Sequence, residues 1–160
     1  MTSLQKAKQA VISYRKATPS DHSTLLELMR ELVAELGASA STPEILDRLD
    51  GDIVTALKSQ RCQFFLALDG EQPAGLSRAD ILDSDPIFRL RKSTLCGYVD
   101  QMYVRDEFRH QGVGQQLLGH CEDWFRSEGI EYSLLHASVA AVGFYARANY
   151  KPNREMFKRL

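Results

Sequence analysis

The stretch that decides the fold is YVDQMYVRDEFRHQGVGQQLLG, residues 98–119. Its apolar first part is typical of a strand, a charged turn follows, and residues 109–114 (RHQGVG) lead at once into a helical pattern. Glycine lets a backbone approach a ligand closely and adopt conformations that a Cβ disfavours. The free N–H groups at a helix start, together with the helix dipole, attract anions. The junction therefore predicts a binding site for a phosphate-bearing ligand at the end of a strand.

The chain after this junction alternates between helical and strand patterns. Apolar residues recur at helical spacing from Val113 to Phe125, and Gly129 ends the predicted helix. Asn149 suits the left-handed position that often follows a helix. The remaining predicted elements are a strand over residues 130–137, a short helix over 139–148 and a last strand over 155–160.

The chain before the junction predicts four strands and two helices. One helix begins at Thr18-Pro19 and ends at Gly37, and the other begins at Thr42-Pro43. Gly51 weakens the second helix by about 1 kcal/mol relative to alanine, enough to allow a break there. The strands cover residues 11–17, 62–68, 74–82 and 95–104, with a hairpin turn at 69–70 and loops at 38–42 and 86–94. This order predicts an α/β (α+β) fold, in which helices pack on a sheet.

Length and composition are those of a soluble globular protein. With 160 residues, 44% of them hydrophobic, we expect a single domain over residues 1–160, with residues 1–10 as a flexible tail. The net charge of −1 gives no general attraction to nucleic acid or to an anionic membrane. The basic segment at residues 89–92 is interpreted as a solvated loop. The sequence shows no apolar signal core and no run long enough to span a membrane.

The three cysteines, Cys62, Cys96 and Cys121, are widely spaced and lie in apolar contexts. We expect them to be small buried hydrophobic residues. They form no Cys or His spacing typical of zinc sites, so no metal is expected. Unpaired cysteines of this kind favour the reducing cytoplasm.

Two motifs of the second half resemble the GCN5-related N-acetyltransferase (GNAT) superfamily. Arg109-x-x-Gly112-x-Gly114 matches the Gln/Arg-x-x-Gly-x-Gly/Ala loop with which that family holds the pyrophosphate of acetyl-CoA. Residues 135–150 resemble the family's later strand–helix unit, which usually ends FYxxxGF, and residues 154–156 are similar to those of small members. Here Asn149 replaces the glycine, which the left-handed region tolerates, and Tyr150 replaces the phenylalanine.

The resemblance implies a mixed, mostly antiparallel sheet with a splay between central strands, a bulge in the strand before the loop, and helices on both faces. It implies acetyl-CoA as co-substrate. Arg109 either touches phosphate or orders the loop. The positions that correspond to the family's cofactor contacts are Met102, Tyr103, Val104, Arg109, His110, Gln111, Gly112, Val113, Gly114, Gln115 and Ser138.

Tyr145 matches the family's usual general acid. A phenol with an ordinary pKa of about 10 is neutral at working pH and can protonate a thiolate. The alternative for Tyr145 is a core aromatic residue beside Phe144. Asp100 lies four residues before Val104, where some members of the family carry an acidic residue, and the resemblance makes it the predicted general base, acting directly or through water. Asp100 could equally be structural, and Asp80 and Asp83 on the hairpin are its rivals.

Other polar residues have two interpretations. His136 is expected to be a core histidine with one hydrogen bond, and His110 is placed to meet phosphate rather than to catalyse. The acids of the second helix form either a solvated face or an acidic rim that attracts a cationic acceptor. They are Glu44, Asp47, Asp50 and Asp52.

Together these features predict an enzyme that moves an acetyl group from acetyl-CoA to a primary amine of a small molecule or peptide, by direct attack in a ternary complex. The alternative is a noncatalytic acyl-CoA-binding module of the same fold. A dinucleotide-binding domain is disfavoured because the GxGxxG spacing and repeated βαβ units are missing. The resemblance assigns acceptor selection to residues 19–59 and 83–95, which carry no recognisable signature, and it allows a homodimer. No nucleic acid or membrane partner is expected.

Overall fold

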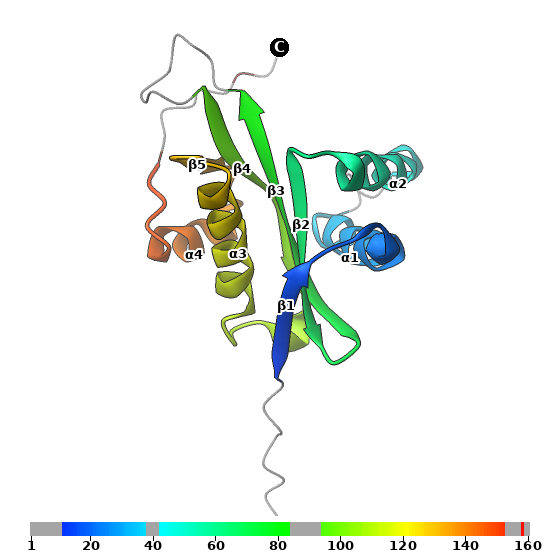
Figure 1. Ribbon diagram of the computed structural model, residues 1–160. Coiled ribbons are helices and arrows are strands. Elements are labelled where there is room, and N and C mark those ends of the chain that lie inside the picture. Colours follow the sequence, from blue (N-terminus) through cyan, green and yellow to red (C-terminus); the bar gives the residue numbers. More distant parts are fainter. Residues whose placement is uncertain (1–10, 38–41, 84–93, 153–157, 159–160) are drawn as a thin grey trace, which may run out of the picture.

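The computed structural model describes residues 11–37, 42–83, 94–152 and 158 (Figure 1). Within them the elements follow the predicted order. They are β1 (Ile12–Lys16), η1 (Pro19–Asp21), α1 (His22–Glu35), α2 (Pro43–Lys58), β2 (Cys62–Asp69), β3 (Gln72–Asp83), β4 (Leu95–Val104), η3 (Asp106–Phe108), α3 (Val113–Ser127), β5 (Ser133–Leu135), η4 (Val139–Ala141) and α4 (Val142–Arg147).

The strands form one sheet in the order β1-β2-β3-β4-β5. Successive strands from β1 to β4 pair antiparallel, and β4 pairs with β5 in parallel. The hairpin between β2 and β3 closes where Asp69 faces Gln72, which confirms the predicted turn. The sheet is therefore mixed and mostly antiparallel, as predicted.

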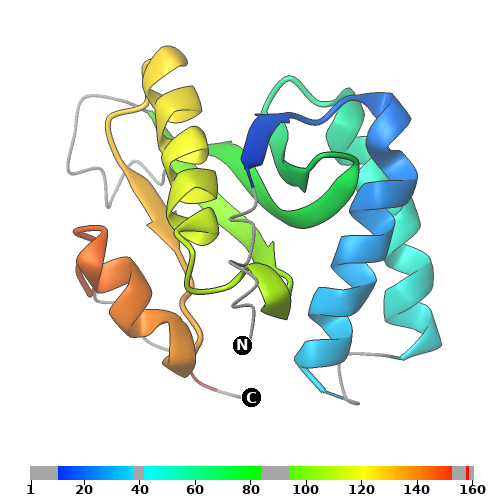
Figure 2. The ribbon, with the colours of Figure 1, turned by 90° about the horizontal axis from the view of Figure 1, so that it is seen from below.

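Helices cover both faces of this sheet. In Figures 1 and 2, α1 and α2 stand side by side on one face, and α3 and α4 lie on the other. Two separate apolar clusters reflect the arrangement, one built from α3 with the sheet and one from α1 and α2 with the sheet. The predicted layers are confirmed. None of the described helices combines the length and the apolar character that crossing a membrane requires.

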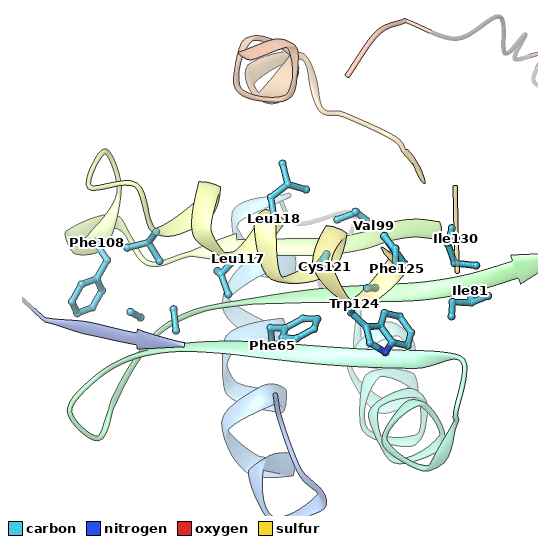
Figure 3. Packing of buried hydrophobic residues seen from close by; sticks show 14 residues of the cluster. Phe65, Ile81, Val99, Phe108, Leu117, Leu118, Cys121, Trp124, Phe125 and Ile130 are labelled. Atoms are coloured by element: carbon cyan, nitrogen blue, oxygen red, sulfur yellow. The ribbon is translucent and has the colours of Figure 1, made fainter. Parts of the chain in front are cut away.

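The larger cluster is the apolar stripe of α3 pressed onto the sheet. Leu117, Cys121 and Phe125 are buried there, at the spacing that the sequence shows. Figure 3 shows Leu117 pointing toward the strands while Leu118 extends from the other side of the helix. Because Leu117 and Leu118 are both buried, α3 packs against the sheet and also against the segment that follows β5.

The starts of α1 and α2 follow from their capping residues. Thr18 and Asp21 form a reciprocal capping box at η1, which runs directly into α1. The hydrogen bond from Arg15 holds the pKa of Asp21 well below its usual range. In α2, the Thr42 hydroxyl accepts from the Ile45 amide, and the helix continues through Gly51 without the break that the sequence allows.

Two predicted elements differ in length from the structure. The strand predicted over residues 130–137 is only β5, because its pairing with β4 stops after Val99 meets Leu135. The helix predicted over 139–148 divides into η4 and α4. Asn149 takes the predicted left-handed conformation, with φ of 67°. The predictions for residues 1–10, most of the loops at 38–42 and 86–94, the basic segment at 89–92 and most of the strand at 155–160 fall outside the described residues.

Gly75 allows β3, β4 and α3 to approach closely. A Cβ at this position would lie 2.5 Å from the Tyr103 carbonyl oxygen and 3.4 Å from Leu117 Cδ1. We expect Gly75→Ala to lower the free energy of unfolding by about 1–3 kcal/mol, because strand backbone has to move. Urea denaturation measures the change.

Gly51→Ala is the matched control, since no atom lies within 4 Å of a Cβ there. In the middle of a helix this substitution should raise stability by about 0.5–1 kcal/mol. A stable Gly75→Ala variant would contradict the packing described for this corner.

Candidate active site

The glycine-containing loop ends in an unusual backbone turn. His110 and Gly112 both have positive φ, 59° and 83°, and Gly112 is the residue before α3. A side chain at position 112 would meet no atom within 4 Å, so conformation rather than space requires glycine. Turns of this kind point successive N–H groups in one direction and form concavities that bind anions.

The amides of this turn are left without partners. In the described chain, none of the backbone N–H groups of residues 110–115 bonds an acceptor, and the first that does is Gln116, which donates to the Gly112 carbonyl at 3.1 Å. His110, Gln111, Gly112 and Gln115 are exposed, whereas Val113 is buried and anchors the helix start. The loop therefore carries six N–H groups without an acceptor in the described chain, at the positive end of a helix.

Arg109 is committed to the protein itself. Its Nε donates to the Val104 carbonyl at 2.7 Å, Nη2 to Glu35 at 2.6 Å, and Nη1 lies 2.6 Å from Asp106. The hydrogen bond to Glu35 is the main cause that raises the pKa of Arg109. Of the two interpretations left open by the sequence, this geometry fits the one in which Arg109 orders the loop.

Arg105, which the sequence did not single out, makes a second tie from the same segment to α1. Its guanidinium donates to Glu31 at 2.9 and 2.7 Å, to the Pro73 carbonyl at 2.9 Å and also to Glu27. Glu27, Glu31 and Glu35 are four residues apart and share one face of α1. In the sequence, the acidic stripe on this helix and the two nearby arginines, Arg105 and Arg109, were the signal from which these ion pairs could have been predicted.

A one-residue bulge interrupts β4 at Asp100. Arg78 on β3 faces Gln101, and the next residue, Ala79, faces Val99, so Asp100 has no partner of its own. Val99 is also the last residue of β4 that pairs with β5. Beyond it, no described strand pairs with this side of β4 along residues 100–104, which include Met102, Tyr103 and Val104. The predicted bulge and splay are both present.

The bulge brings Asp100 to a cluster of charges around Arg78. Arg78 binds Asp80 through Nε at 2.8 Å and Nη2 at 3.2 Å, binds Asp52 of α2 through Nη1 at 2.6 Å, and lies 3.7 Å from Asp100. Gln101 donates to Asp100 through its side-chain amide. Burial is the main cause that raises the pKa of Asp100, and Asp80 and Asp52 add to it, while Arg78 opposes it.

The two rivals of Asp100 have different surroundings. Asp80 is held by two bonds from Arg78 and is only 14% exposed. Asp83 is 75% exposed and pairs with Arg61 at 2.9 Å, at the end of β3. Of the three carboxylates, Asp100 combines a raised pKa with a place beside the opening between β4 and β5.

Tyr145 lies on the other face of the sheet. Its ring is half-buried against the α3 cluster and contacts Phe144 and Tyr150 edge-on, with centroids 5.0 and 5.9 Å away. Its hydroxyl makes no hydrogen bond within the described chain, and burial raises its pKa. Asp100 and Tyr145 thus lie on opposite faces of the sheet, and no interaction between described residues joins them.

Two histidines and Ser138 complete the predicted positions. The expectation of a core His136 is wrong: this residue is exposed just after β5, and its Nδ1 bonds the hydroxyl of Tyr98 on β4. It leaves the core because β5 ends before it. Ser138 is exposed at the start of η4. His110 is exposed in the loop, which fits its predicted place beside an anion.

The cysteines are only partly as expected. Cys96 and Cys121 are buried, whereas Cys62 is half-buried beside Arg78 and Asp80. Burial is the main cause that raises the pKa of the Cys62 and Cys121 thiols to about 12, so both stay protonated. Across the described ranges, no group of three or more His, Cys, Asp or Glu side chains is placed to hold a metal ion.

The acids of α2 also divide into two kinds. Asp52 is bound to Arg78 at 2.6 Å, and Asp50 lies 3.2 Å from His22 on α1. Glu44 and Asp47 are exposed. The helix therefore carries solvated acids near its start, and further along one acid beside α1 and one bound to the sheet.

Known proteins share both the sequence pattern and the fold. The sequence model described as the acetyltransferase (GNAT) family matches residues 25–150, most of the chain. The chain belongs to this acetyltransferase family. The resemblance that the loop and the later strand–helix unit indicated is therefore confirmed.

Individual relatives of this GNAT chain are distant in sequence. It is 24% identical over 139 residues to thialysine N-epsilon-acetyltransferase of Caenorhabditis elegans, a match that covers 83% of this chain and 79% of that protein. Its fold is similar to that of a GCN5-related N-acetyltransferase from Ralstonia eutropha, with a TM-score of 0.83, 23% identity and 93% and 98% of the two chains covered. It is also similar to the fold of a predicted acetyltransferase from Clostridium acetobutylicum, solved with acetyl-CoA, with a TM-score of 0.82 and 21% identity. That match covers 93% of this chain and 96% of the other.

The role of Arg109 in ordering the loop can be measured directly. In Arg109→Met, the backbone order parameters of residues 109–112 should fall from about 0.85 to below about 0.6, because three ties to the rest of the protein are lost. Arg30→Met, at an exposed position of α1, is the control and should leave them unchanged. Unaltered order in Arg109→Met would favour the other interpretation, direct contact with phosphate.

Proposed function

We propose that this GNAT chain transfers the acetyl group of acetyl-CoA to a primary amine of a small molecule, with both substrates bound at once. The observation that carries the proposal is the run of six unpaired amides, residues 110–115, directly beside the unpaired edge of β4. The amides suit a diphosphate. The open strand edge suits the amide-bearing arm of coenzyme A, which can pair with it as an added strand. Residues 1–160 act as one catalytic domain in this proposal.

The donor is held mainly by backbone. His110, Gln111, Gly112, Val113, Gly114 and Gln115 contribute their N–H groups, and Ser138 borders the arm from η4. Met102, Tyr103 and Val104 supply the strand edge, and an N–H there polarises the thioester carbonyl. Arg109 contributes by fixing the loop through Val104 and Glu35.

Asp100 and Tyr145 handle the protons of the reaction. The amine nitrogen attacks the thioester carbon, a C–N bond forms, and the C–S bond breaks. Asp100 accepts the proton that the amine loses, directly or through water, and Tyr145 gives its phenolic proton to the departing thiolate. A raised pKa suits both groups, because Asp100 becomes a stronger base and Tyr145 stays protonated.

The acceptor is proposed to be a small amine with further positive charge. Asp52, Asp80 and Asp100 surround the single guanidinium of Arg78 beside the splay, so negative charge is in excess there. Such a surface attracts cations. The relative from Caenorhabditis elegans is named for thialysine, and a similar fold has been solved as an aminoglycoside acetyltransferase with sisomicin. Both names denote small amines.

Release of coenzyme A from acetyl-CoA over a panel of amines tests the proposal. Polycationic amines should give kcat/KM at least about tenfold above amines with no second charge, and this advantage should shrink as salt screens the charges. Equal turnover of both groups would remove the cationic acceptor. Tight binding of acetyl-CoA with no release for any amine would favour the noncatalytic acyl-CoA-binding module.

The acid assignment makes a separate prediction. Tyr145→Phe should lower kcat by about 100-fold while leaving the affinity for acetyl-CoA unchanged, because only the proton donor is lost. Tyr150→Phe is the matched control: its hydroxyl also lies in the α3 cluster but bonds Ser133 at 2.7 Å. A Tyr145→Phe variant with normal kcat would leave Tyr145 as a packing residue beside Phe144.

A further inference from the structure

Arg78 has a place in the fold that the reaction scheme above does not use. Its side chain is only 13% exposed, on the sheet face covered by α1 and α2, and its guanidinium lies 5.6 Å from the centroid of the Phe64 ring. Burying a guanidinium is costly unless its donors are paired. Here Asp80 and Asp52 pair it from two elements, β3 and α2.

The strand bulge brings Asp100 to the same guanidinium. Residues 99, 102 and 104 of β4 pack in the α3 cluster, and Tyr103 packs in the cluster of the other face. The alternation therefore shifts by one residue between Val99 and Met102, at the bulge. Asp100 lies 3.7 Å from Arg78 Nε as a result.

The charges that face Asp100 do not cancel. Three carboxylates share one guanidinium, which leaves a formal excess of two negative charges when all are ionised. Two further polar groups at this cluster are neutral: the Gln101 amide, which donates to Asp100, and the Cys62 thiol beside Arg78 and Asp80. Arg78 is accordingly the only cation among the described residues of this cluster.

We propose that Arg78 is the positioning residue of the acetyl-transfer site, which orients Asp100 and keeps it ionised so that it can accept the amine proton. This inference rests on the proposed role of Asp100 as the base. Asp52 and Asp80 take part indirectly, because they hold the guanidinium in place and also repel the charge of Asp100.

Removing the cation and removing a carboxylate should shift the pKa of Asp100 in opposite directions. A cation within about 4–6 Å lowers the pKa of a carboxyl by about 1–3 units, and a nearby carboxylate raises it. Removing Arg78 should therefore raise the pKa of Asp100, and removing Asp52 should lower it. Since the ionised base is the active form, activity is lost as the pH falls through this pKa, and the acidic limb of kcat/KM follows in the same direction.

The experiment is a pH titration of the Asp100 carboxyl carbon by ¹³C NMR, assigned with Asp100→Asn, beside the pH profile of kcat/KM. In Arg78→Met, the midpoint of the Asp100 titration and the acidic limb of the kcat/KM profile should both move to higher pH, by about one pH unit or more. In Asp52→Asn, at a half-exposed position that tolerates the change, both should move down. In Arg78→Lys, which keeps the positive charge, the midpoint of the Asp100 titration should lie much closer to its value in the unaltered protein.

Arg126→Met is the control. Arg126 also contacts two carboxylates, Glu122 at 3.3 Å and Asp123 at 2.7 Å, but on the exposed side of α3. It should leave midpoint and limb unchanged. A fall in kcat of Arg78→Met at every pH, with no shift of the midpoint, would overturn the inference and make Arg78 a structural residue. Should Arg78→Met fail to fold, an unmoved midpoint in Asp52→Asn would overturn it equally.

The two proposals can fail separately. If Asp100→Asn retains full activity while Arg78→Met still moves the Asp100 midpoint, Asp100 is not the base, although Arg78 controls its ionisation. If Asp100→Asn is inactive and the midpoint of the Asp100 titration does not change in the Arg78 or Asp52 variants, Asp100 is supported as the base and Arg78 is not its positioning residue.

Discussion

The extra residue in β4 is the constraint on which the candidate site depends. A strand in the middle of a sheet has to satisfy N–H and C=O groups on both sides. The bulge at Asp100 coincides with the end of pairing to β5, so beyond Val99 the strand β4 pairs with no described strand other than β3. The same bulge turns Asp100 toward Arg78. An open backbone edge and a carboxylate beside it thus have one common cause.

Arg105 and Arg109, at the two ends of the charged turn, fix the position of the glycine-containing loop relative to the open edge of β4. Arg105 and Arg109 attach the segment after β4 to three glutamates of α1, a helix on the opposite face from α3. Unpaired amides by themselves favour no single conformation. These ion pairs, together with the buried Val113, hold the loop where α3 begins. If the loop binds an anion, as proposed, these contacts fix its conformation before the ligand arrives and so reduce the entropy cost of binding.

The features that could be predicted from the sequence are those encoded by neighbouring residues. Periodicity and capping residues predicted every described α-helix and strand, although not the short helix η3, and Gly112 with its neighbours marked the turn before α3. Sequence reasoning failed where contacts join distant residues: Arg78 with Asp52, Arg105 with Glu31, and Tyr98 with His136 are separated by 26, 74 and 38 positions. No periodic signal connects such pairs. The bulge was predicted only through the family resemblance, because one unpaired residue leaves no mark on an alternating strand.

The two sides of the splay solve different physical problems. On the α3 side, a ligand is met by backbone groups whose number and direction are set by helix and strand geometry, which suits a constant donor. On the α2 side, charge is supplied by side chains from α2, β3 and β4. If the two sides act as proposed, acceptor preference can change by substitution of side chains while donor binding persists. The loop motif was readable in one sequence because its residues are local, whereas the proposed acceptor surface joins residues of three elements and required coordinates.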